Sequence, residues 1–389
     1  MKLITRITRI GRLNDDKRRK GATLLLALFI SGALLLGPSI SEANLTKKTP
    51  ASPFLLAGVT NVKQISQLTG AKSPNATEKY KIVGTDLGSM FRAHGKTWFV
   101  FGDTFGERAA NLTGGGGTIW RSNTLAYSSD TNPSDGIKLD GFIVDDVGWA
   151  KELLSSIKVD NLEMTVIPTY GFEANGAMYL AYMSVKHWGV PGEWEVNHSG
   201  LAKSKDKGQS WTKLAAPRWT GTSNFVQVSV TKIGSYLYFW GVTHGRFSGV
   251  QLMRVPEKKV ESLKEYEYFS GTTTDLQPKW SKKQSAAETI VEDTVGELSV
   301  VWNGYLKRWL MTYTNGGGSG TTIRESVSPW GPWGDGLSLI SGEKTPGQYA
   351  PYMLPEYTAK NGKTIFFTLS LWDPYNVFWY SADLVKKTS

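Results

Sequence analysis

The sequence predicts an all-β fold, a five-bladed β-propeller, and three observations lead to that prediction. A unit of apolar strand, tight turn and aromatic-rich strand recurs five times, with turns at His94-Gly95, Asn175-Gly176, Gly234-Ser235, Asn303-Gly304 and Asn361-Gly362. The turn glycines lie 81, 58, 70 and 58 residues apart. The strands are apolar on both faces, as in sheets that pack face to face around an axis. A β-sandwich would show cleaner alternation, because one face of each sheet is solvated.

The first element in the chain is an N-terminal leader. A basic stretch through DDKRRK meets the apolar run GATLLLALFISGALLLG, which ends at Pro38, and small residues follow at Ser41 and Ala43. This order is typical of a secretory signal peptide. We therefore expect residues 1–43 to be cleaved near Ala43 and the protein to be secreted or extracytoplasmic. An uncleaved membrane anchor is the alternative, because the apolar run is close to the length that spans a bilayer.

A polar linker at 44–57 and a single propeller domain at 58–385 are expected after the leader. His-Gly and Asn-Gly suit the positive φ angles of tight hairpin turns, and the β-branched and aromatic runs after them suit strands. Between the second and third turns, SKDKGQSW fits the Asp-box hairpin pattern Ser-x-Asp-x-Gly-x-x-Trp. We interpret it as a structural turn in which Asp206 caps backbone N–H groups and Trp211 packs between strands.

Charge and composition exclude several functions. The chain has 389 residues and a net charge of +10, of which the leader contributes +5 from eight Lys/Arg and three Asp/Glu. The remaining basic residues are scattered, which argues against nucleic-acid binding. Cysteine is absent, so disulfides and thiolate chemistry are excluded. The four histidines show no metal-ligand spacing, and no cofactor is predicted, although a structural Ca²⁺ ion is an open alternative.

Two aspartates in GTDLGSMFRAHGKTWFVFGDTFG, residues 84–106, form the candidate catalytic pair. A two-residue turn at His94-Gly95 pairs residues whose numbers sum to 189, which places Asp86 opposite Asp103. Opposed side chains have Cβ atoms about 4.5–5.5 Å apart, and opposed like charges are destabilising. One apparent pKa of such a pair is expected to rise, as acid/base chemistry requires.

Three other interpretations of the pair stay open. The aspartates could hold Ca²⁺, Asp103 could cap its own loop through Thr104, or a bulge could shift the register and separate the two carboxyls. Glu297 lies seven residues before its turn glycine, and Asp86 lies nine residues before its own. Because side chains alternate along a strand, a difference of two residues places both on the same face. It is a candidate third acid or substrate ligand, or alternatively the partner of a nearby Lys or Arg.

Loops that follow the second strands carry candidate substrate-binding residues on the rim marked by Asp103. Aromatic faces pack against sugar rings, and Asp, Asn, Arg and His hydrogen-bond to hydroxyls, so a sugar cleft is expected there. A single Trp in such a loop can equally be part of blade packing. The candidates are His187, Trp188, His244, Arg246, Trp372, Asp373 and Asn376.

Across residues 78–381 the sequence resembles a known family, the secreted endo-D-arabinanases of glycoside hydrolase family 183. The resemblance rests on GTDLGSMFRAHGKTWFVFGDTFG, YMSVKHWGVPGEWEVNHSGLAKSKDKGQSW, VGELSVVWNGYLKRWLMTY, SPWGPW, YAPYMLPE and SLWDPYNV, in that order. It implies a five-bladed propeller, with its active site at one end of the central channel, that cleaves internal α-D-arabinofuranosyl linkages of cell-wall D-arabinan in arabinogalactan and lipoarabinomannan. The family's catalytic aspartates match Asp86 and Asp103.

The expected function is therefore that of an exported, monomeric glycoside hydrolase acting on a polysaccharide. Carboxyls about 5 Å apart would indicate a retaining enzyme and roughly 6.5–9.5 Å an inverting one, and the sequence does not assign the acid. A non-catalytic propeller lectin is the first alternative. A sialidase or another furanosidase is less favoured. A sialidase requires three arginines at one rim and a tyrosine nucleophile, and although Arg246 and Arg324 are available, the sequence does not place three arginines at one rim.

Overall fold

The computed structural model describes residues 53–388, and the predicted signal peptide and most of the predicted linker lie outside them. The described chain is almost entirely antiparallel β-structure. Its helices are five short 3₁₀ turns: η1 Thr77–Tyr80, η2 Glu257–Lys259, η3 Leu263–Glu265, η4 Gln284–Ala286 and η5 Lys360–Gly362. Within these residues, no helix has the length and apolar character needed to cross a membrane.

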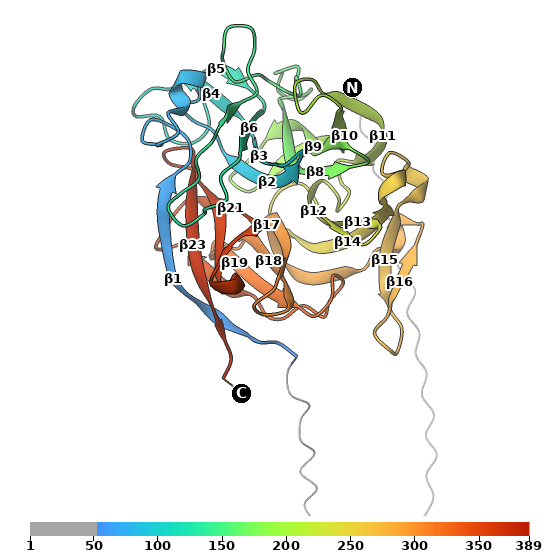
Figure 1. Cartoon of the computed structure of the whole chain (residues 1–389). Helices are drawn as coiled ribbons and strands as arrows, with labels where there is room; N and C mark the ends of the chain where they lie inside the picture. The colour runs from blue at the N-terminus through green and yellow to red at the C-terminus, as the bar shows by residue number, and fades with distance from the viewer. Residues whose placement is uncertain (1–52, 389) are drawn as a thin grey trace, which may run out of the picture. The chain divides into compact units, whose positions relative to one another are not determined.

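Four sheets and one small ribbon contain the strands, which Figure 1 shows in chain order from blue to red. The first sheet consists of β2 Leu87–Ala93, β3 Lys96–Phe101, β6 Thr124–Ser128 and β7 Gly141–Phe142. The ribbon consists of β4 Thr104–Glu107 and β5 Thr118–Arg121. The second sheet consists of β8 Thr165–Ala174, β9 Ala177–Trp188, β10 Trp194–Ser204 and β11 Thr212–Thr220.

The third sheet is larger because β14 also pairs with β17, which joins two groups of strands into nine. Its members are β12 Gln227–Ile233, β13 Tyr236–Val242, β14 Ser248–Pro256, β15 Glu267–Thr272, β16 Pro278–Ser281, β17 Thr289–Asn303, β18 Arg308–Asn315, β19 Gly320–Ser326 and β20 Leu337–Ser341. The fourth sheet consists of β21 Gln348–Ala359, β22 Thr364–Leu371, β23 Asn376–Lys386 and β1 Leu56–Gln67.

The first strand of each repeated hairpin contributes to a closed cycle of contacts. Strand β2 contacts β8, β8 contacts β12, β12 contacts β17, β17 contacts β21, and β21 contacts β2 again. These five strands lie nearest the centre of the view in Figure 1. The starts of β2 and β21 lie together, because the Tyr349 hydroxyl in β21 donates to Asp86, the residue before β2.

The predicted hairpin turns lie where the sequence placed them. His94 and Gly95 have φ of 48° and 76°, and Asn175 and Gly176 have φ of 51° and 71°. The third turn joins β12 to β13 directly. The last two are longer than expected, since residues 304–307 separate β17 from β18 and η5 separates β21 from β22.

The core explains why the strands are apolar on both faces. Every residue of 177–185 in β9 and of 237–242 in β13 is buried, so these strands have neighbours on each side. Trp240 and Trp379 have no exposed surface, and their indole N–H groups donate to the carbonyls of Pro329 and Pro133, each at 2.9 Å. In a chain without cysteine, this packing is the main source of stability.

The Asp-box has the structural role expected of it. Asp206 accepts hydrogen bonds from the Ser210 backbone N–H at 3.0 Å and from the Ser204 hydroxyl at 2.8 Å. The Trp211 indole N–H donates to the Gly208 carbonyl at 3.0 Å, and its ring packs against the buried cluster beneath β9. The box closes the turn between β10 and β11.

Strand β1 is an element that the sequence did not predict. It begins at Leu56, two residues before the expected domain start, and pairs antiparallel with the last strand, β23, in partner pairs such as Val59 with Leu384. The Lys387 N–H also donates to the Leu55 carbonyl at 2.7 Å. The two ends of the described chain therefore complete one sheet together.

Candidate active site

The two aspartates lie at adjacent strand ends, but they are not directly opposed. Five pairs from Ala93↔Lys96 to Ser89↔Val100 follow the predicted register. A one-residue shift then pairs Leu87 with Phe101, and the Gly102 N–H donates to the Asp86 carbonyl at 3.2 Å. This corrects the predicted Asp86–Asp103 opposition, because Asp86 faces Gly102 and Asp103 lies one residue beyond it, at the bend between β3 and β4.

A bulge at Gly88 causes the shift. Leu87 and Gly88 have φ of 66° and 81°, a left-handed conformation that a leucine adopts only at a cost. Ala350 in β21 and Tyr375 before β23 also have positive φ, of 58° and 62°. Leu87 follows Asp86, Ala350 follows Tyr349, and Tyr375 itself acts on Asp86. Strained backbone of this kind often clusters at functional sites, where the surrounding structure enforces it.

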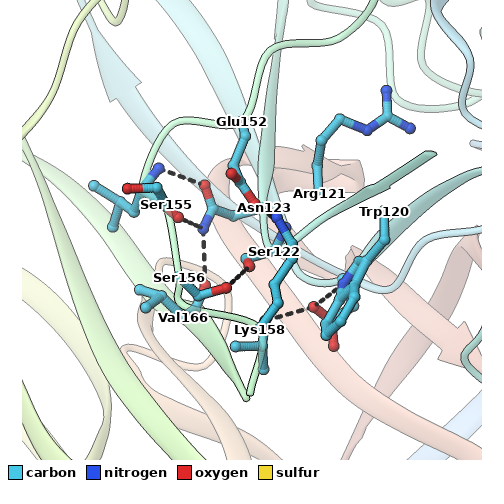
Figure 2. A network of polar contacts seen from close by, with 12 residues as sticks. Trp120, Arg121, Ser122, Asn123, Glu152, Ser155, Ser156, Lys158 and Val166 are labelled. Atoms are coloured by element: carbon cyan, nitrogen blue, oxygen red, sulfur yellow. Dashed lines mark hydrogen bonds and ion pairs between the residues drawn. The ribbon is translucent and has the colours of Figure 1, made fainter. Parts of the chain in front are cut away.

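Asp103 is buried and oriented by two donors. The Trp120 indole N–H at 2.8 Å and the Thr165 hydroxyl at 2.6 Å both donate to its Oδ1, and 7% of the residue is exposed. Burial raises the pKa of Asp103 to about 7, against the opposing effects of the two hydrogen bonds and of the Lys158 charge. Figure 2 shows Trp120 beside Lys158 in the surrounding polar network.

Asp86 has fewer partners. The Tyr349 hydroxyl donates to its Oδ2 at 3.0 Å, whereas its buried Oδ1 has no hydrogen-bond partner among residues 53–388. Burial is the main reason that the pKa of Asp86 rises to about 7, and repulsion from Asp103 adds to it. Tyr349 and Tyr375 lower this pKa, and Glu297 raises it slightly. The two aspartates therefore interact, and the pair can hold one proton near neutral pH.

Glu297 is an ionised carboxylate paired with an arginine. This is the alternative that the sequence offered to a role as a third acid. The Arg246 Nε donates to Oε1 and Oε2 at 3.2 and 3.1 Å, and Nη2 donates to Oε1 at 2.8 Å. Although burial opposes ionisation, the Arg246 charge and hydrogen bonds hold the pKa of Glu297 below its usual value. The Arg246 guanidinium also lies over the rings of Trp194 and Tyr349, at 5.8 and 5.1 Å from their centroids.

The cluster collects residues from four strands of the closed cycle. Asp86 immediately precedes β2, Thr165 is the first residue of β8, and Tyr349 is the second residue of β21. Glu297 lies in β17. The starts of β2, β8 and β21 thus place donors and carboxyls at the same end of the cycle.

Both tryptophans predicted for the rim are exposed and contact aromatic residues of this cluster or next to it. Trp372 is 53% exposed, and its ring lies edge-on to Tyr375 at 5.9 Å. Trp188 is 37% exposed and lies edge-on to Trp194 at 5.7 Å. Asp373 is exposed beside Trp372. These side chains can meet a ligand next to the carboxyls.

The other predicted ligand-binding residues differ in their surroundings. His187 Nδ1 lies 2.7 Å from Asp160 Oδ1 on the surface. His244 lies edge-on to Phe247 at 5.4 Å, and its buried Nδ1 has no partner within the described chain. Asn376 is 4% exposed and accepts the Thr69 hydroxyl at 2.9 Å. This corrects the expectation that Asn376 faces a ligand, because its side chain is used inside the fold.

Several residues of the site were not singled out from the sequence. Tyr349 opens the motif YAPYMLPE, and Trp120 follows the run of glycines in NLTGGGGTIW. Thr165 and Lys158 carry no local signal. Tyrosine and tryptophan are so common in the buried strands that only contacts across the fold distinguish these two.

The described residues form no metal cluster, and the two arginines considered for a sialidase site are each bound to a carboxylate. From 53 to 388, no group of three or more His, Asp or Glu side chains is arranged to hold a metal ion. Arg324 donates to Asp293 Oδ2 at 2.7 Å and to the Tyr313 hydroxyl at 2.8 Å. Arg246 and Arg324 are therefore each committed to a carboxylate of the chain.

Comparison with known proteins gives a family and a fold. The family DUF4185, described as a domain of unknown function, matches residues 72–381. A candidate hydrolase from Bacteroides ovatus has a similar structure at 13% identity, with a TM-score of 0.50, over 84% of this chain and 93% of that one. So does an exo-β-1,3-galactanase from Phanerochaete chrysosporium at 9% identity, with a TM-score of 0.52, over 85% and 67%. No curated protein matches the sequence.

Proposed function

The chain belongs to the DUF4185 family, and from that premise we propose that it is a glycoside hydrolase that uses Asp86 and Asp103 as its carboxyl pair. One observation carries the proposal. Two buried aspartates interact, both with a raised pKa, while Arg246 forms its hydrogen bonds with Glu297 and with neither of them. A fold gains no stability from such an arrangement, whereas acid/base catalysis requires it.

The proposed chemistry divides the work between the two carboxyls. One, in its acid form, donates its proton to the departing glycosidic oxygen as the bond to the anomeric carbon breaks. The other, ionised, either attacks the anomeric carbon or takes the proton from the water that does so. In both courses the net reaction adds one water across one glycosidic bond.

Five blades around a channel are the architecture that we propose for this reaction. The closed cycle of β2, β8, β12, β17 and β21 supports it, because each of these strands is the first of one repeated hairpin. The pairing of β14 with β17 then joins the third and fourth blades at their edges. The carboxyls would stand at the mouth of the channel, where the first strands begin.

As substrate we propose the D-arabinan of mycobacterial arabinogalactan and lipoarabinomannan, cut at internal α-D-arabinofuranosyl linkages. The resemblance to glycoside hydrolase family 183 supports the linkage. The exposed rings of Trp188 and Trp372 support a carbohydrate ligand in general. We also propose that the protein is exported as a monomer after cleavage near Ala43, which N-terminal sequencing and light scattering of the secreted protein would test.

The experiment that tests the function compares four proteins that lack residues 1–43. The parent, Asp86→Asn, Asp103→Asn and Asp383→Asn are incubated with mycobacterial arabinogalactan, with plant L-arabinan as a second substrate. Asp383 is the matched control because it is also buried and accepts a threonine hydroxyl. The parent and Asp383→Asn should release D-arabino-oligosaccharides, and the two site variants should not.

Two outcomes would contradict the proposal. Full activity of either site variant would remove that aspartate from the reaction. Retention of the polysaccharide without release of oligosaccharides would favour the lectin instead, for which the exposed Trp188 and Trp372 are equally suited.

A further inference from the structure

We propose that Lys158, through the indole of Trp120, holds Asp103 as the carboxylate and thereby leaves the proton of the pair on Asp86. The inference rests on the proposed function and adds to it the roles of the two aspartates and a residue that fixes them. Lys158 contacts neither aspartate through a hydrogen bond, so it is a positioning residue.

The donors around the two carboxyls are unequal. Asp103 Oδ1 accepts two hydrogen bonds, from the Trp120 indole N–H and the Thr165 hydroxyl. An indole N–H can only donate, so it favours the ionised form of Asp103. Asp86 Oδ2 accepts the Tyr349 hydroxyl and Tyr375 also lowers the pKa of this carboxyl, but the buried Oδ1 of Asp86 has no partner in the described chain. A buried oxygen without a donor favours the neutral acid.

Lys158 strengthens this difference. Its Nζ lies 5.5 Å from the centroid of the Trp120 ring, and Figure 2 shows the two side chains next to each other. A cation at that distance is attracted to the ring and polarises the indole N–H toward its acceptor. The positive charge also acts directly on Asp103, the effect of an opposite charge on a carboxyl.

The loop that carries Lys158 is built to keep it there. Asn123 Oδ1 accepts the backbone N–H groups of Leu153 and Leu154 at 3.0 and 2.8 Å, and its Nδ2 donates to the carbonyls of Leu154 and Val166 at 2.9 and 2.8 Å. Three of these bonds fasten the loop to Asn123, which lies between β5 and β6, and the fourth joins Asn123 to Val166 in β8, as Figure 2 shows.

The backbone is strained at both partners of the contact. Lys158 has φ of 58°, and Ile119, immediately before Trp120, has φ of 52°. A β-branched residue in the left-handed region is a true outlier. Strain on both sides of one cation and one ring indicates that their placement is enforced.

Glu152 limits the effect of Lys158. Its Oε1 lies 2.7 Å from Lys158 Nζ and also accepts the Ser122 N–H at 2.8 Å. The charged and titratable groups that bear on Asp103 are thus Lys158 and Glu152 in the loop, Asp86 before β2, and Tyr375 before β23. Removal of Lys158 and removal of Glu152 should therefore have opposite consequences for Asp103.

The test follows Asp103 without relying on activity. The protein is labelled with 5-fluorotryptophan, the Trp120 resonance is assigned from its loss in Trp120→Phe, and its ¹⁹F shift is followed from pH 4 to 9. Lys158→Met should raise the midpoint by about one pH unit, the order expected when a charge near a carboxyl is lost. Lys158→Arg should keep the parent midpoint, and Glu152→Gln should lower it.

Lys186→Met is the matched control, because Lys186 also pairs with a glutamate, at 2.7 Å, and neither partner is among the groups named as acting on the pKa of Asp103. It should leave the midpoint unchanged. If glycoside hydrolysis is detected, the acid limb of the pH profile of kcat/KM should move with the NMR midpoint in each variant.

The outcomes separate this inference from the proposed function. If the parent cuts no glycan but the midpoint rises in Lys158→Met and falls in Glu152→Gln, the function is overturned and the charge arrangement is retained. A midpoint that is the same in the parent, Lys158→Met and Glu152→Gln would overturn the inference, whether or not the protein is active. If Lys158→Met does not fold, Glu152→Gln alone decides, because a downward shift supports the inference and no shift refutes it.

Discussion

Replacement of Asp86 by asparagine should make the protein more stable at alkaline pH while it abolishes the proposed activity. The pKa of Asp86 rises from 3.8 to about 7 on folding, first because of burial and then because of repulsion from Asp103. Between these two values the folded protein binds more protons than the unfolded chain. The contribution of Asp86 to stability is therefore greatest at low pH and falls as the pH rises through 7.

The size of the effect follows from the shift. At about 1.4 kcal/mol per pKa unit, ionised Asp86 destabilises the folded state by about 4 kcal/mol when the shift is fully expressed. Roughly 3 kcal/mol of this arises between pH 5 and pH 8. Asparagine carries no charge at either pH and can still accept the Tyr349 hydroxyl, so the variant should not pay this penalty.

Urea unfolding of the parent and of Asp86→Asn at pH 5 and pH 8 measures the difference. The variant should exceed the parent in free energy of unfolding at pH 8, and the gap should narrow at pH 5. Asp383→Asn provides the contrast, because the hydroxyl of Thr364, Asn61 and then Lys360 lower the pKa of Asp383 to about 2, and its loss should destabilise at both pH values. Parallel pH dependence of the parent and Asp86→Asn would show that the carboxyl is not destabilising and would remove the main argument for catalysis.

Three further substitutions give defined outcomes. Arg246→Met leaves Glu297 buried without its partner and should cost about 3–5 kcal/mol in urea unfolding, whereas an unchanged midpoint would mean that the pair is solvated. Tyr349→Phe removes a donor that lowers the pKa of Asp86, so the midpoint of Asp86 ionisation, read from the pH profile of activity, should rise and not fall. Gly88→Ala places a side chain at φ of 81° and should lower stability by about 1–3 kcal/mol, and a neutral result would show that the bulge can relax.

The hairpins could be predicted from the sequence because they depend on turn residues and on the strands next to them in the chain. His94-Gly95 and Asn175-Gly176 adopt the positive φ angles that such pairs favour, and the strands beside them are buried on both faces as their composition indicates. Contacts between distant segments were less accessible. Strand β1 carries no strong strand pattern of its own and is formed by its pairing with β23, more than 300 residues away.

The candidate site shows the same limit. Turn position alone brought Asp86 and Asp103 to neighbouring strand ends, but the single extra residue at Gly88 changed which residues face each other. Gly88 was a visible signal for a bulge, since an isolated glycine in a strand often marks one. Trp120, Thr165 and Tyr349 reach the aspartates across the fold from separate strands, and no local pattern encodes that.

The shared sheet of β1 and β23 makes the chain a candidate for circular permutation. Because Lys387 bonds to Leu55, a short glycine-rich linker could join residue 388 to residue 53 without disturbing either strand. New ends could then open in the exposed loop at 273–277, between β15 and β16. Such a permutant would keep every hydrogen bond of the fourth sheet, with its four strands consecutive in the chain. The difference in free energy of unfolding between the permutant and the parent would measure the effect of a covalent link between β23 and β1.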